Sequence, residues 1–442
     1  MTATAPATVR FMPGMSPRSS VDARIAPCIA RFVDWLEHHG ETSYDHQSYY
    51  AGPFGGRAKA LYYRRRWLGT MTVAPMVLSE AFLPSARRLF WHPQRFPIAD
   101  AHYAMGFAYR YRAGGDQRDR LRALHFLDVL EATRCPDYAR HAWGYPFDWV
   151  TRTGVMHAGT PLITTTPYAY EAFLALHEID GDRRWLDVMR SIADHALHDI
   201  PDRRLDADSS CAGYNPDDVQ GGVVNASAYR SFLLMHAAHR FSDSACHETA
   251  LRNLRYVLAA QKPDGSWPYA TDGVRDFVDH FHTCFVLKAL AKIERLEPNG
   301  ALSAAIDAGV AYYVTHLFDE RGLPRPFSRA PRLTVYRQEL YDYAECINLG
   351  ALLAGRSVAL DERVRDAVGD LLGRWQKVDG SFRSRRLMLG WDDVPMHRWA
   401  QAQLFRSLCL LLLGAPAAPT SRRTGAGAAL HVTAREPDPV QP

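Results

Sequence analysis

A short turn motif recurs in the second half of the chain at a nearly constant interval, and this spacing constrains the fold more than any other feature. The motif is Asp-Gly-Ser-Trp at 264–267 and Asp-Gly-Ser-Phe at 379–382, with RGLPRPF between them. Its glycines, Gly265, Gly322 and Gly380, are 57 and 58 positions apart. A fixed period of this length predicts supersecondary units that stack in an array or close into a ring.

Segments with helical periodicity alternate with these turns. We expect helices at 98–113, 116–134, 161–179, 182–199, 222–240, 243–262, 275–294, 300–318, 337–354, 359–377 and 395–413. Some carry charge on one face and others are rich in small and apolar residues, so outer and inner helices are expected to alternate. With the amphipathic segment 20–39 as the last outer helix, the pattern predicts an all-α fold. This fold is an (α/α)6 toroid, with six inner and six outer helices and short β-turn segments.

The regions outside the repeats are assigned by composition. Residues 1–18 are rich in Pro, Ala and Thr and are predicted to be a disordered N-terminus, and residues 415–442 a disordered tail. Residues 19–414 are predicted to form a single toroid domain. Within it, 40–97 is irregular and aromatic, with one helix near 67–82, and is interpreted as a lid or N-terminal insert.

Composition narrows the functional classes. The net charge of +4 over 442 residues gives no indication of nucleic-acid binding. The longest apolar run, Leu408 to Leu413, is too short to cross a bilayer. Seven scattered cysteines without a CxxC pair favour reduced thiols, and no secretory signal is recognisable, so a cytoplasmic protein is expected. No P-loop, GxGxxG, GxSxG or HExxH motif is present, and no cofactor is predicted.

Two turn motifs resemble those of a known group of toroids. AAQKPDGSWPY and GRWQKVDGSF are similar to the Gln-to-Trp repeats of squalene and hopene cyclases, which implies that Gln261 with Trp267, and Gln376 with Phe382, tie helix ends together. The cyclase acid motif Asp-x-Asp-Asp is absent, because the nearest candidate is Asp-Ala-Asp-Ser at 206–209.

The segment FVDHFHTCFVLKAL resembles the His-Thr-Cys helix of protein prenyltransferase β-subunits, where the histidine binds zinc. His282 is the matching position. Those enzymes place an Asp-x-Cys pair one repeat earlier, whereas this chain has Asn225 and Ser227 there. The resemblance therefore implies the toroid, but neither a zinc ion nor protein prenylation.

Other proteins with the toroid fold are carbohydrate enzymes: uronate lyases, unsaturated-uronyl hydrolases, sugar 2-epimerases and glucuronyl epimerases. GYPFDW, TTTPYAYEAF and DHFHTCFVL together are similar to uncharacterised toroid proteins of bacterial exopolysaccharide biosynthesis clusters. This resemblance implies a saccharide or polysaccharide substrate.

The segment 272–290 is the strongest candidate for a site. Asp276, Asp279 and His280 are expected on one side of a helix, and His282 follows Asp279 by three positions. The part from Phe285 to Leu290 is interpreted as apolar on all sides and therefore buried.

In a toroid, the starts of the inner helices and the long loops before them would form the mouth of a central cavity. Carboxylates and imidazoles at those positions serve acid/base chemistry. The candidate catalytic residues are Asp279, His282, Asp342, Glu345, Asp393 and His397. The candidate substrate-binding residues are Asp148, Arg152, Tyr168, Asn215, Asp218, Asp276, His280, Tyr341, Trp391, Arg398 and Trp399. Arg152 and Arg398 are the expected clamps for a uronate carboxylate.

Structural roles compete with these interpretations. Acids in a first helical turn interact favourably with the helix dipole, and Asp392 and Asp393 before Pro395 could simply cap a helix. His282 could be a hydrogen-bonded core residue. The Asp-Gly-Ser turns are expected to be structural, because Asp-Gly readily adopts positive φ.

The sequence favours an enzyme of exopolysaccharide biosynthesis or modification that performs acid/base chemistry on a glycan as a hydrolase, lyase or epimerase. One alternative is a terpenoid cyclase-like or prenyltransferase-like enzyme that binds an isoprenoid. Another is a non-catalytic toroid that binds a glycan. Carboxylates and arginines around the floor and rim would favour the sugar, whereas an aromatic floor with one acid would favour the isoprenoid.

Overall fold

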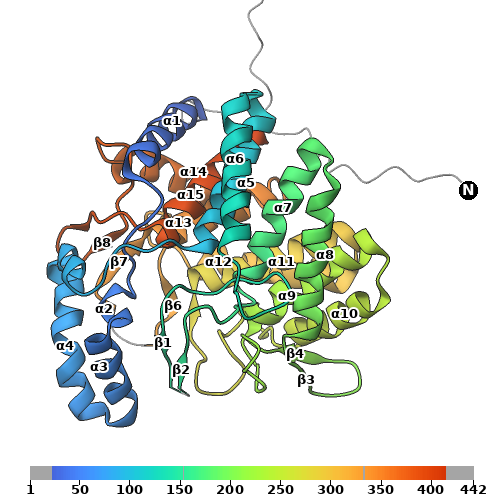
Figure 1. Ribbon diagram of the computed structural model, residues 1–442, viewed down its shortest axis with the longest axis horizontal. Coiled ribbons are helices and arrows are strands. Elements are labelled where there is room, and N and C mark those ends of the chain that lie inside the picture. The colour runs from blue at the N-terminus through green and yellow to red at the C-terminus, as the bar shows by residue number, and fades with distance from the viewer. Residues whose placement is uncertain (1–21, 153, 332–333, 415–442) are drawn as a thin grey trace, which may run out of the picture.

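The computed structural model describes residues 22–152, 154–331 and 334–414 (Figure 1). The segments 1–18 and 415–442, for which the sequence predicts disorder, lie outside the described residues.

Six helices form an inner ring. They are α5 (Pro97–Gly114), α7 (Thr166–Asp180), α9 (Val224–Phe241), α11 (His280–Leu296), α13 (Leu340–Leu352) and α15 (Ala402–Leu413). Each packs against the next in chain order, and α15 packs back against α5, so the ring is closed. Their small and apolar residues are buried almost throughout, which is what contact on all sides requires.

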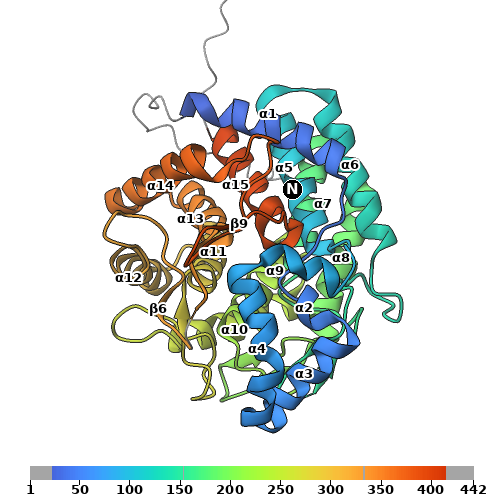
Figure 2. The same ribbon diagram turned by 90° about the vertical axis from the view of Figure 1, so that its left-hand side faces the viewer.

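Six further helices surround this ring, as Figures 1 and 2 show. They are α1 (Asp22–His39), α6 (Gln117–Ala132), α8 (Arg183–His198), α10 (Ser244–Ala259), α12 (Gly300–His316) and α14 (Val358–Asp370). Each packs against the inner helix before it, except α1, which packs against α15 at the end of the chain. The predicted (α/α)6 toroid, including the closing role of the first helix, is confirmed.

Turn chemistry explains the short links from inner to outer helices. Gly115 and Gly181 end α5 and α7 in the left-handed conformation that favours glycine. The next residues, Asp116 and Asp182, cap α6 and α8 by accepting a hydrogen bond from a backbone N–H of the first turn. An inner helix therefore stops and its outer partner begins within two residues.

The repeated turns join neighbouring outer helices. Gln261 donates from Nε2 to the carbonyl of Ala305 on α12 at 2.9 Å, and Gln376 donates to the carbonyl of Cys28 on α1 at 2.8 Å. Gly265 and Gly380 have positive φ, and a Cβ on either would lie 2.2–2.3 Å from a carbonyl oxygen of the next outer helix. The structural role expected for these turns is confirmed.

Short antiparallel strands lie in the long loops. They are β1 (Trp149–Val150), β2 (Val155–Met156), β3 (Asp202–Arg204), β4 (Ser210–Ala212), β5 (Val278–Asp279), β6 (Phe327–Arg329), β7 (Tyr336–Glu339), β8 (Arg385–Leu387) and β9 (Trp391–Asp392). β1 pairs with β2, β3 with β4, β5 with β6, and β7–β8–β9 form one sheet. These loops lead into the starts of the inner helices and gather at one end of the ring, which we call the mouth.

The structure corrects several sequence-based boundaries. The helix expected at 275–294 begins only at His280, because Val278 and Asp279 pair with β6. Asp276, Asp279 and His280 therefore do not share a helical face. The last helix begins at Ala402, after an irregular turn at His397–Gln401 in which Trp399 and Ala400 are not helical. The helix expected at 359–377 ends in a π-helical turn, Leu371–Trp375.

The N-terminal insert is more regular than its sequence suggests. It contains α2 (Ser48–Ala51), α3 (Pro53–Arg64), α4 (Arg66–Phe82) and a 3₁₀ turn at Pro84–Leu89. The helix near 67–82 is confirmed, whereas α3 was not expected. α3 and α4 pack as a hairpin at one side of the toroid (Figures 1 and 2).

Candidate functional site at the mouth of the toroid

Asp279 and His282 form a pair at the start of α11. Asp279 is the N-cap: its Oδ1 accepts from the backbone N–H of His282 at 2.9 Å, and its Oδ2 lies 2.6 Å from Nδ1 of the same residue. This contact places the imidazole proton on Nδ1, so that Nε2 carries the lone pair. The side chain of Asp279 is 2% exposed and that of His282 is 22% exposed. The pair thus presents a basic nitrogen toward solvent and keeps its orienting carboxylate buried.

Aromatic rings surround this imidazole. The ring of Tyr269 meets His282 edge-on with the centroids 4.7 Å apart, and Phe285 does so at 5.5 Å. Phe281 lies 4.4 Å from the imidazole on the same helix. The apolar surroundings exclude water from most of the imidazole and leave one nitrogen accessible.

The starts of α13 and α15 supply a second aromatic wall. Tyr341 and Trp399 stack with their centroids 4.4 Å apart, and Phe281 meets Tyr341 edge-on at 5.1 Å. Arg398 lies over Tyr145 at 4.6 Å and beside Trp399 at 5.1 Å.

We call this surface the aromatic bowl. Its rings come from the mouth loops and from the inner-helix starts: Tyr145, Tyr214, Tyr269, Phe281, Tyr341 and Trp399. All except Tyr341 are partly exposed. Flat ring faces of this kind suit the apolar faces of pyranose rings.

Asp342 adds a carboxyl group that is fully buried beneath the bowl. Neither of its oxygens has a hydrogen-bond partner among the described residues. Burial raises the pKa of Asp342 well above its ordinary value, and the nearby carboxylates of Glu339 and Asp279 raise it further. The raised pKa favours the protonated form of Asp342, which is the form that can donate a proton.

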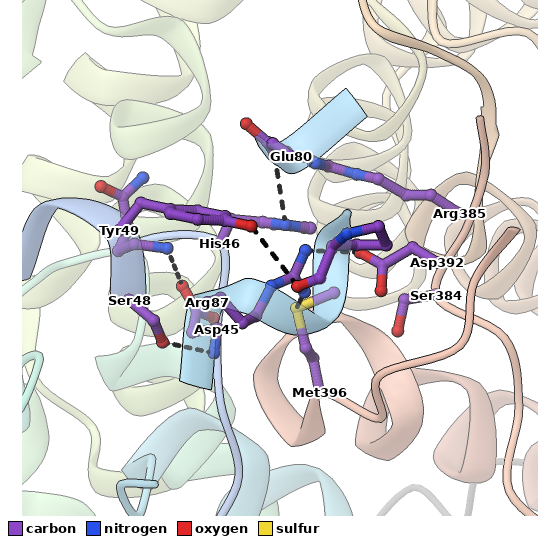
Figure 3. Close-up of polar contacts among 12 residues, drawn as sticks. Asp45, His46, Ser48, Tyr49, Glu80, Arg87, Ser384, Arg385, Asp392 and Met396 are labelled. Carbon is purple, nitrogen blue, oxygen red and sulfur yellow. Dashed lines mark hydrogen bonds and ion pairs between the residues drawn. The ribbon is translucent and has the colours of Figure 1, made fainter. Parts of the chain in front are cut away.

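The N-terminal insert is bound to the mouth by buried ion pairs (Figure 3). Arg87 donates to Asp392 at 2.5 Å, and both side chains are fully buried. Asp45 accepts two hydrogen bonds from Arg398, at 2.5 and 2.9 Å. This pairing fixes Arg398 to Asp45 of the insert.

A second contact of the insert involves Arg385, which bridges two carboxylates. Arg385 binds Glu80 of α4 at 2.5 Å and also pairs with Glu339 of β7. His46 lies between these carboxylates, 3.8 Å from Glu80 and 3.5 Å from Glu339. Burial lowers the pKa of His46 well below its ordinary value, and the charges of Arg385, Arg87 and Arg398 lower it further, so His46 is neutral.

Deeper along the ring axis, every inner helix contributes polar side chains to one buried group, which we call the axial cluster. Its members are His102, Tyr168, Glu171, Tyr229, Lys288, Lys292, Glu345 and Arg406. Lys288 pairs with Glu345, which Arg406 approaches to 3.7 Å. Burial lowers the pKa of Lys288 to about 8, although Glu345 acts in the opposite direction. The floor below the bowl is therefore charged.

Several residues predicted from the sequence converge at the mouth or below it: Asp279, His282, Tyr341, Asp342 and Trp399 at the mouth, and Tyr168 and Glu345 in the axial cluster. Others have structural partners elsewhere. The imidazole of His397 bonds the hydroxyl of Tyr103 and the carbonyl of Gly40, and His280 bonds Tyr313 and the carbonyl of Leu317. Neither imidazole reaches the bowl.

The remaining predicted residues lie in loops and at the periphery. Asp393 is more than half exposed and pairs with Arg383, and Trp391 packs against Trp375. Asn215 and Asp218 accept backbone hydrogen bonds within their own turn. Asp148 bonds the backbone N–H of Ala158, and Arg152 and Asp276 are exposed.

The sequence interpretation missed Lys288 and Arg406. Lys288 lies within the run from Phe285 to Leu290 that was taken as apolar on all sides, and Arg406 lies in an equally apolar helix. A single charge inside a buried helix needs a partner, and this is the signal that could have revealed both residues. Glu345 follows Lys288 by 57 positions, the same interval as between Gly265 and Gly322, so the two occupy equivalent places in successive inner helices.

The residues that resemble the zinc site of prenyltransferases are occupied otherwise. His282 pairs with Asp279, and the hydroxyl of Ser227 accepts from the backbone N–H of Ala212. Within 22–152, 154–331 and 334–414, no group of three or more His, Cys, Asp and Glu side chains is placed to hold a metal ion.

A groove of about 520 Å³ lies beside the mouth, between β6, β7 and β8. Four arginines line it, and we call it the arginine groove: Arg321, Arg325, Arg337 and Arg386. Of these, Arg321 pairs with Asp319, whereas Arg337 and Arg386 have no ion-pair partner among the described residues. Gln338 at its wall is 3% exposed, and its Oε1 has no hydrogen-bond partner there. The groove is thus an electropositive surface next to the bowl.

No protein-family model matches the chain, and no curated protein sequence matches it. Solved structures do resemble it. A cellobiose 2-epimerase from Bacillus thermoamylovorans B4167 superimposes with a TM-score of 0.57 at 8% identity, over 72% of this chain and 87% of that one. A polysaccharide lyase superimposes with a TM-score of 0.54 at 10% identity, over 89% of this chain and 97% of that one.

A third similar structure holds a saccharide. It is an inactive variant of an α-1,6-mannanase from Salegentibacter sp. HEL1_6 in complex with α-1,6-mannotriose, with a TM-score of 0.53 at 11% identity, over 73% of this chain and 91% of that one. At such identities the likeness shows the fold alone. The chain has the six-hairpin toroid of these carbohydrate-active enzymes.

Proposed function

We propose that the protein is a carbohydrate-active enzyme that performs acid/base chemistry on a glycan held in the aromatic bowl. The observation that carries the proposal is the Asp279–His282 pair, with an imidazole that is oriented through Nδ1 and partly exposed among aromatic rings. The charged floor formed by Lys288, Glu345 and Arg406 supports a sugar over an isoprenoid. The shared fold with an epimerase, a lyase and a mannanase supports the same class.

The residues present fit proton abstraction from carbon better than glycoside hydrolysis. Hydrolysis requires two carboxyl groups that flank the bond. Here the accessible group is an imidazole, and the carboxyl group of Asp342, whose pKa burial raises, lies beneath the bowl. In this proposal His282 Nε2 removes a proton from a ring carbon next to a carboxylate, and Asp279 stabilises the resulting imidazolium. Asp342 then protonates either the leaving oxygen, as in elimination, or the carbon, as in epimerisation.

We propose an acidic glycan as the substrate, such as a uronate-bearing exopolysaccharide or its precursor. A carboxylate next to the abstracted proton delocalises the negative charge that forms on the carbon. The arginine groove supports this choice, because Arg337 and Arg386 are unpaired among the described residues and arginine binds carboxylates in a bidentate manner. The seven buried, unpaired cysteines support a reducing, cytoplasmic compartment as part of the proposal.

The test is to incubate the full chain with acidic and neutral oligosaccharides and to analyse the products by mass spectrometry, by nuclear magnetic resonance and by ultraviolet absorbance of new double bonds. A product of unchanged mass with an altered resonance spectrum indicates epimerisation, and cleavage into two fragments of which one absorbs indicates elimination. His282→Ala and Asp279→Asn should both lose turnover. Full turnover in both variants would remove the site assignment, and hydrolysis products alone would overturn proton abstraction.

A further inference from the structure

The α3–α4 hairpin of the insert exposes an unusual amount of apolar surface. Nineteen large apolar side chains are exposed in the described residues, and ten of them lie between Phe54 and Leu89: Phe54, Tyr63, Trp67, Leu68, Met71, Val77, Leu78, Phe82, Leu83 and Leu89. The other nine are scattered over the rest of the chain. Single exposed apolar residues are normal, but a cluster of this size marks an interaction surface.

The cluster forms a stripe on α4. Trp67, Met71, Leu78 and Phe82 follow one another at intervals of four, seven and four residues, which places them on one helical face. They are 74%, 63%, 58% and 57% exposed. The opposite face is packed, with Met76 only 1% exposed and Gly69 so close to α3 that a Cβ there would lie 2.0 Å from Tyr62 Cα. The exposed stripe is thus the outer face of a packed hairpin.

Positive charge accompanies the stripe. Residues 53–89 contain seven Lys and Arg and one Glu. Arg87 is buried in its ion pair with Asp392 and Lys59 is half-buried, whereas the other five cations are exposed. Arg64, Arg65 and Arg66 are consecutive at the junction of α3 and α4, directly before Trp67, and all three are exposed. None of the three has an ion-pair partner among the described residues. An apolar face bordered by arginines, with a tryptophan at the boundary, has the composition of a helix that lies on an anionic lipid surface.

The hairpin is long enough to lie on a membrane but not to cross one. α4 has 17 residues, and no helix within the described parts of the chain is both long and apolar enough to span a bilayer. Its base is fixed to the mouth by the ion pairs of Glu80 with Arg385 and of Arg87 with Asp392 (Figure 3). The exposed stripe therefore belongs to a rigid element of the protein.

We propose that the α3–α4 hairpin docks the protein on the surface of an anionic phospholipid membrane. The stripe of Trp67, Met71, Leu78 and Phe82 inserts among the acyl chains, and Arg64, Arg65 and Arg66 bind the headgroups. This assignment stands on the exposure and charge of the hairpin and is independent of the chemistry at the mouth.

The experiment is co-sedimentation of the full chain with phosphatidylcholine vesicles, prepared with and without phosphatidylglycerol. The wild type should bind only the anionic vesicles, and added salt should release it, because headgroup contacts are screened. Arg64→Ala/Arg65→Ala/Arg66→Ala should weaken partitioning on the order of a hundredfold, since each arginine near such a surface contributes roughly fivefold. Far-ultraviolet circular dichroism confirms that each variant is folded.

The matched control removes three exposed arginines elsewhere, as Arg24→Ala/Arg134→Ala/Arg183→Ala, and should keep vesicle binding. A second readout is quenching of tryptophan fluorescence by brominated lipid, which Trp67→Phe should reduce while binding persists. Equal binding to neutral vesicles, or equal losses in the two triple variants, would overturn the proposal. A third result would also overturn it: the protein does not bind vesicles, light scattering shows a dimer, and Leu78→Ser/Phe82→Ser converts that dimer to monomers. The stripe would then be the interface with a second copy.

Discussion

The mouth and the axial cluster are built from the same inner helices, yet their paired polar groups differ in exposure to solvent. In the axial cluster, Lys288 and Glu345 are buried in the middle of their helices and pair with each other. At the mouth, His282 is oriented by Asp279 through one nitrogen and remains 22% exposed. A group must reach solvent to meet a substrate, so the difference in exposure favours the helix starts as the reactive centre.

The comparison predicts its largest effect at Asp342, which is buried like the axial cluster but lies at a helix start like the mouth. Asp342→Asn should lower kcat/KM by roughly 10²–10⁴-fold, because a general acid is lost while the volume is kept. Steady-state kinetics measure this effect, with a melting curve to show an intact fold. A kcat/KM within twofold of the wild type would remove Asp342 from the chemistry.

The pH dependence of activity follows from the same residue. The pKa of Asp342 is raised, so its proton is retained to a higher pH than that of an ordinary carboxyl group and is lost as pH rises through the raised value. Activity of the wild type should therefore fall on the alkaline side, and the residual activity of Asp342→Asn should lack this fall. The free energy of unfolding should also fall as pH rises through the raised value, because the folded state binds the proton of Asp342 more tightly than the unfolded state does. An alkaline fall that is identical in both proteins would assign it to another group.

In the axial cluster, we predict a large change in stability instead. Lys288→Met leaves Glu345 buried with only the more distant Arg406, and should lower the free energy of unfolding by ~3–5 kcal/mol. Lys288→Met/Glu345→Gln removes both charges and should recover most of that loss. Urea denaturation of the two single variants and the double variant measures the coupling energy. Additive losses would show that the pair does not stabilise the protein in the manner described.

A moderate effect is expected in the arginine groove. Arg337→Ala/Arg386→Ala should raise KM for an acidic oligosaccharide about tenfold, which corresponds to ~1.4 kcal/mol, and leave KM for a neutral one unchanged. Arg24→Ala/Arg134→Ala removes the same charge at a distance and serves as the control. An equal rise in KM in the groove variant and in the control variant would show that these arginines act only through the overall charge of the protein.

The smallest effect is expected at the periphery. Asp393 is exposed and pairs only with Arg383 on the surface, so Asp393→Asn should change the free energy of unfolding by less than ~0.5 kcal/mol and leave turnover unchanged. A loss of turnover in this variant would show that the catalytic site includes Asp393 and reaches well beyond the bowl.

The alternation of helices was predictable because each inner helix is buried on all sides and each outer helix on one. The distribution of apolar residues around each helix in the sequence reflects this difference. The start of α11 was not, because Val278 and Asp279 pair with β6, a contact that local periodicity does not contain. α3 escaped prediction because two glycines, Gly55 and Gly56, weaken its pattern, although the packing of α4 stabilises it.

Within the site, the predictable part was local and the missing part was long-range. Asp279 and His282 are three positions apart, and an N-cap side chain reaches the residue three positions later, so their contact is local. Arg398 was expected to clamp a substrate, but its partner is Asp45, more than three hundred residues away in the insert. Such pairings depend on how the chain closes, which residue spacing does not specify.

Chemical rescue tests the central claim most directly. His282→Ala should abolish turnover of an acidic oligosaccharide, and added imidazole should restore part of it, because the small base can occupy the space vacated beside the buried carboxylate of Asp279. His282→Ala that turns over the substrate at the wild-type rate without imidazole would contradict the claim that this residue is the base.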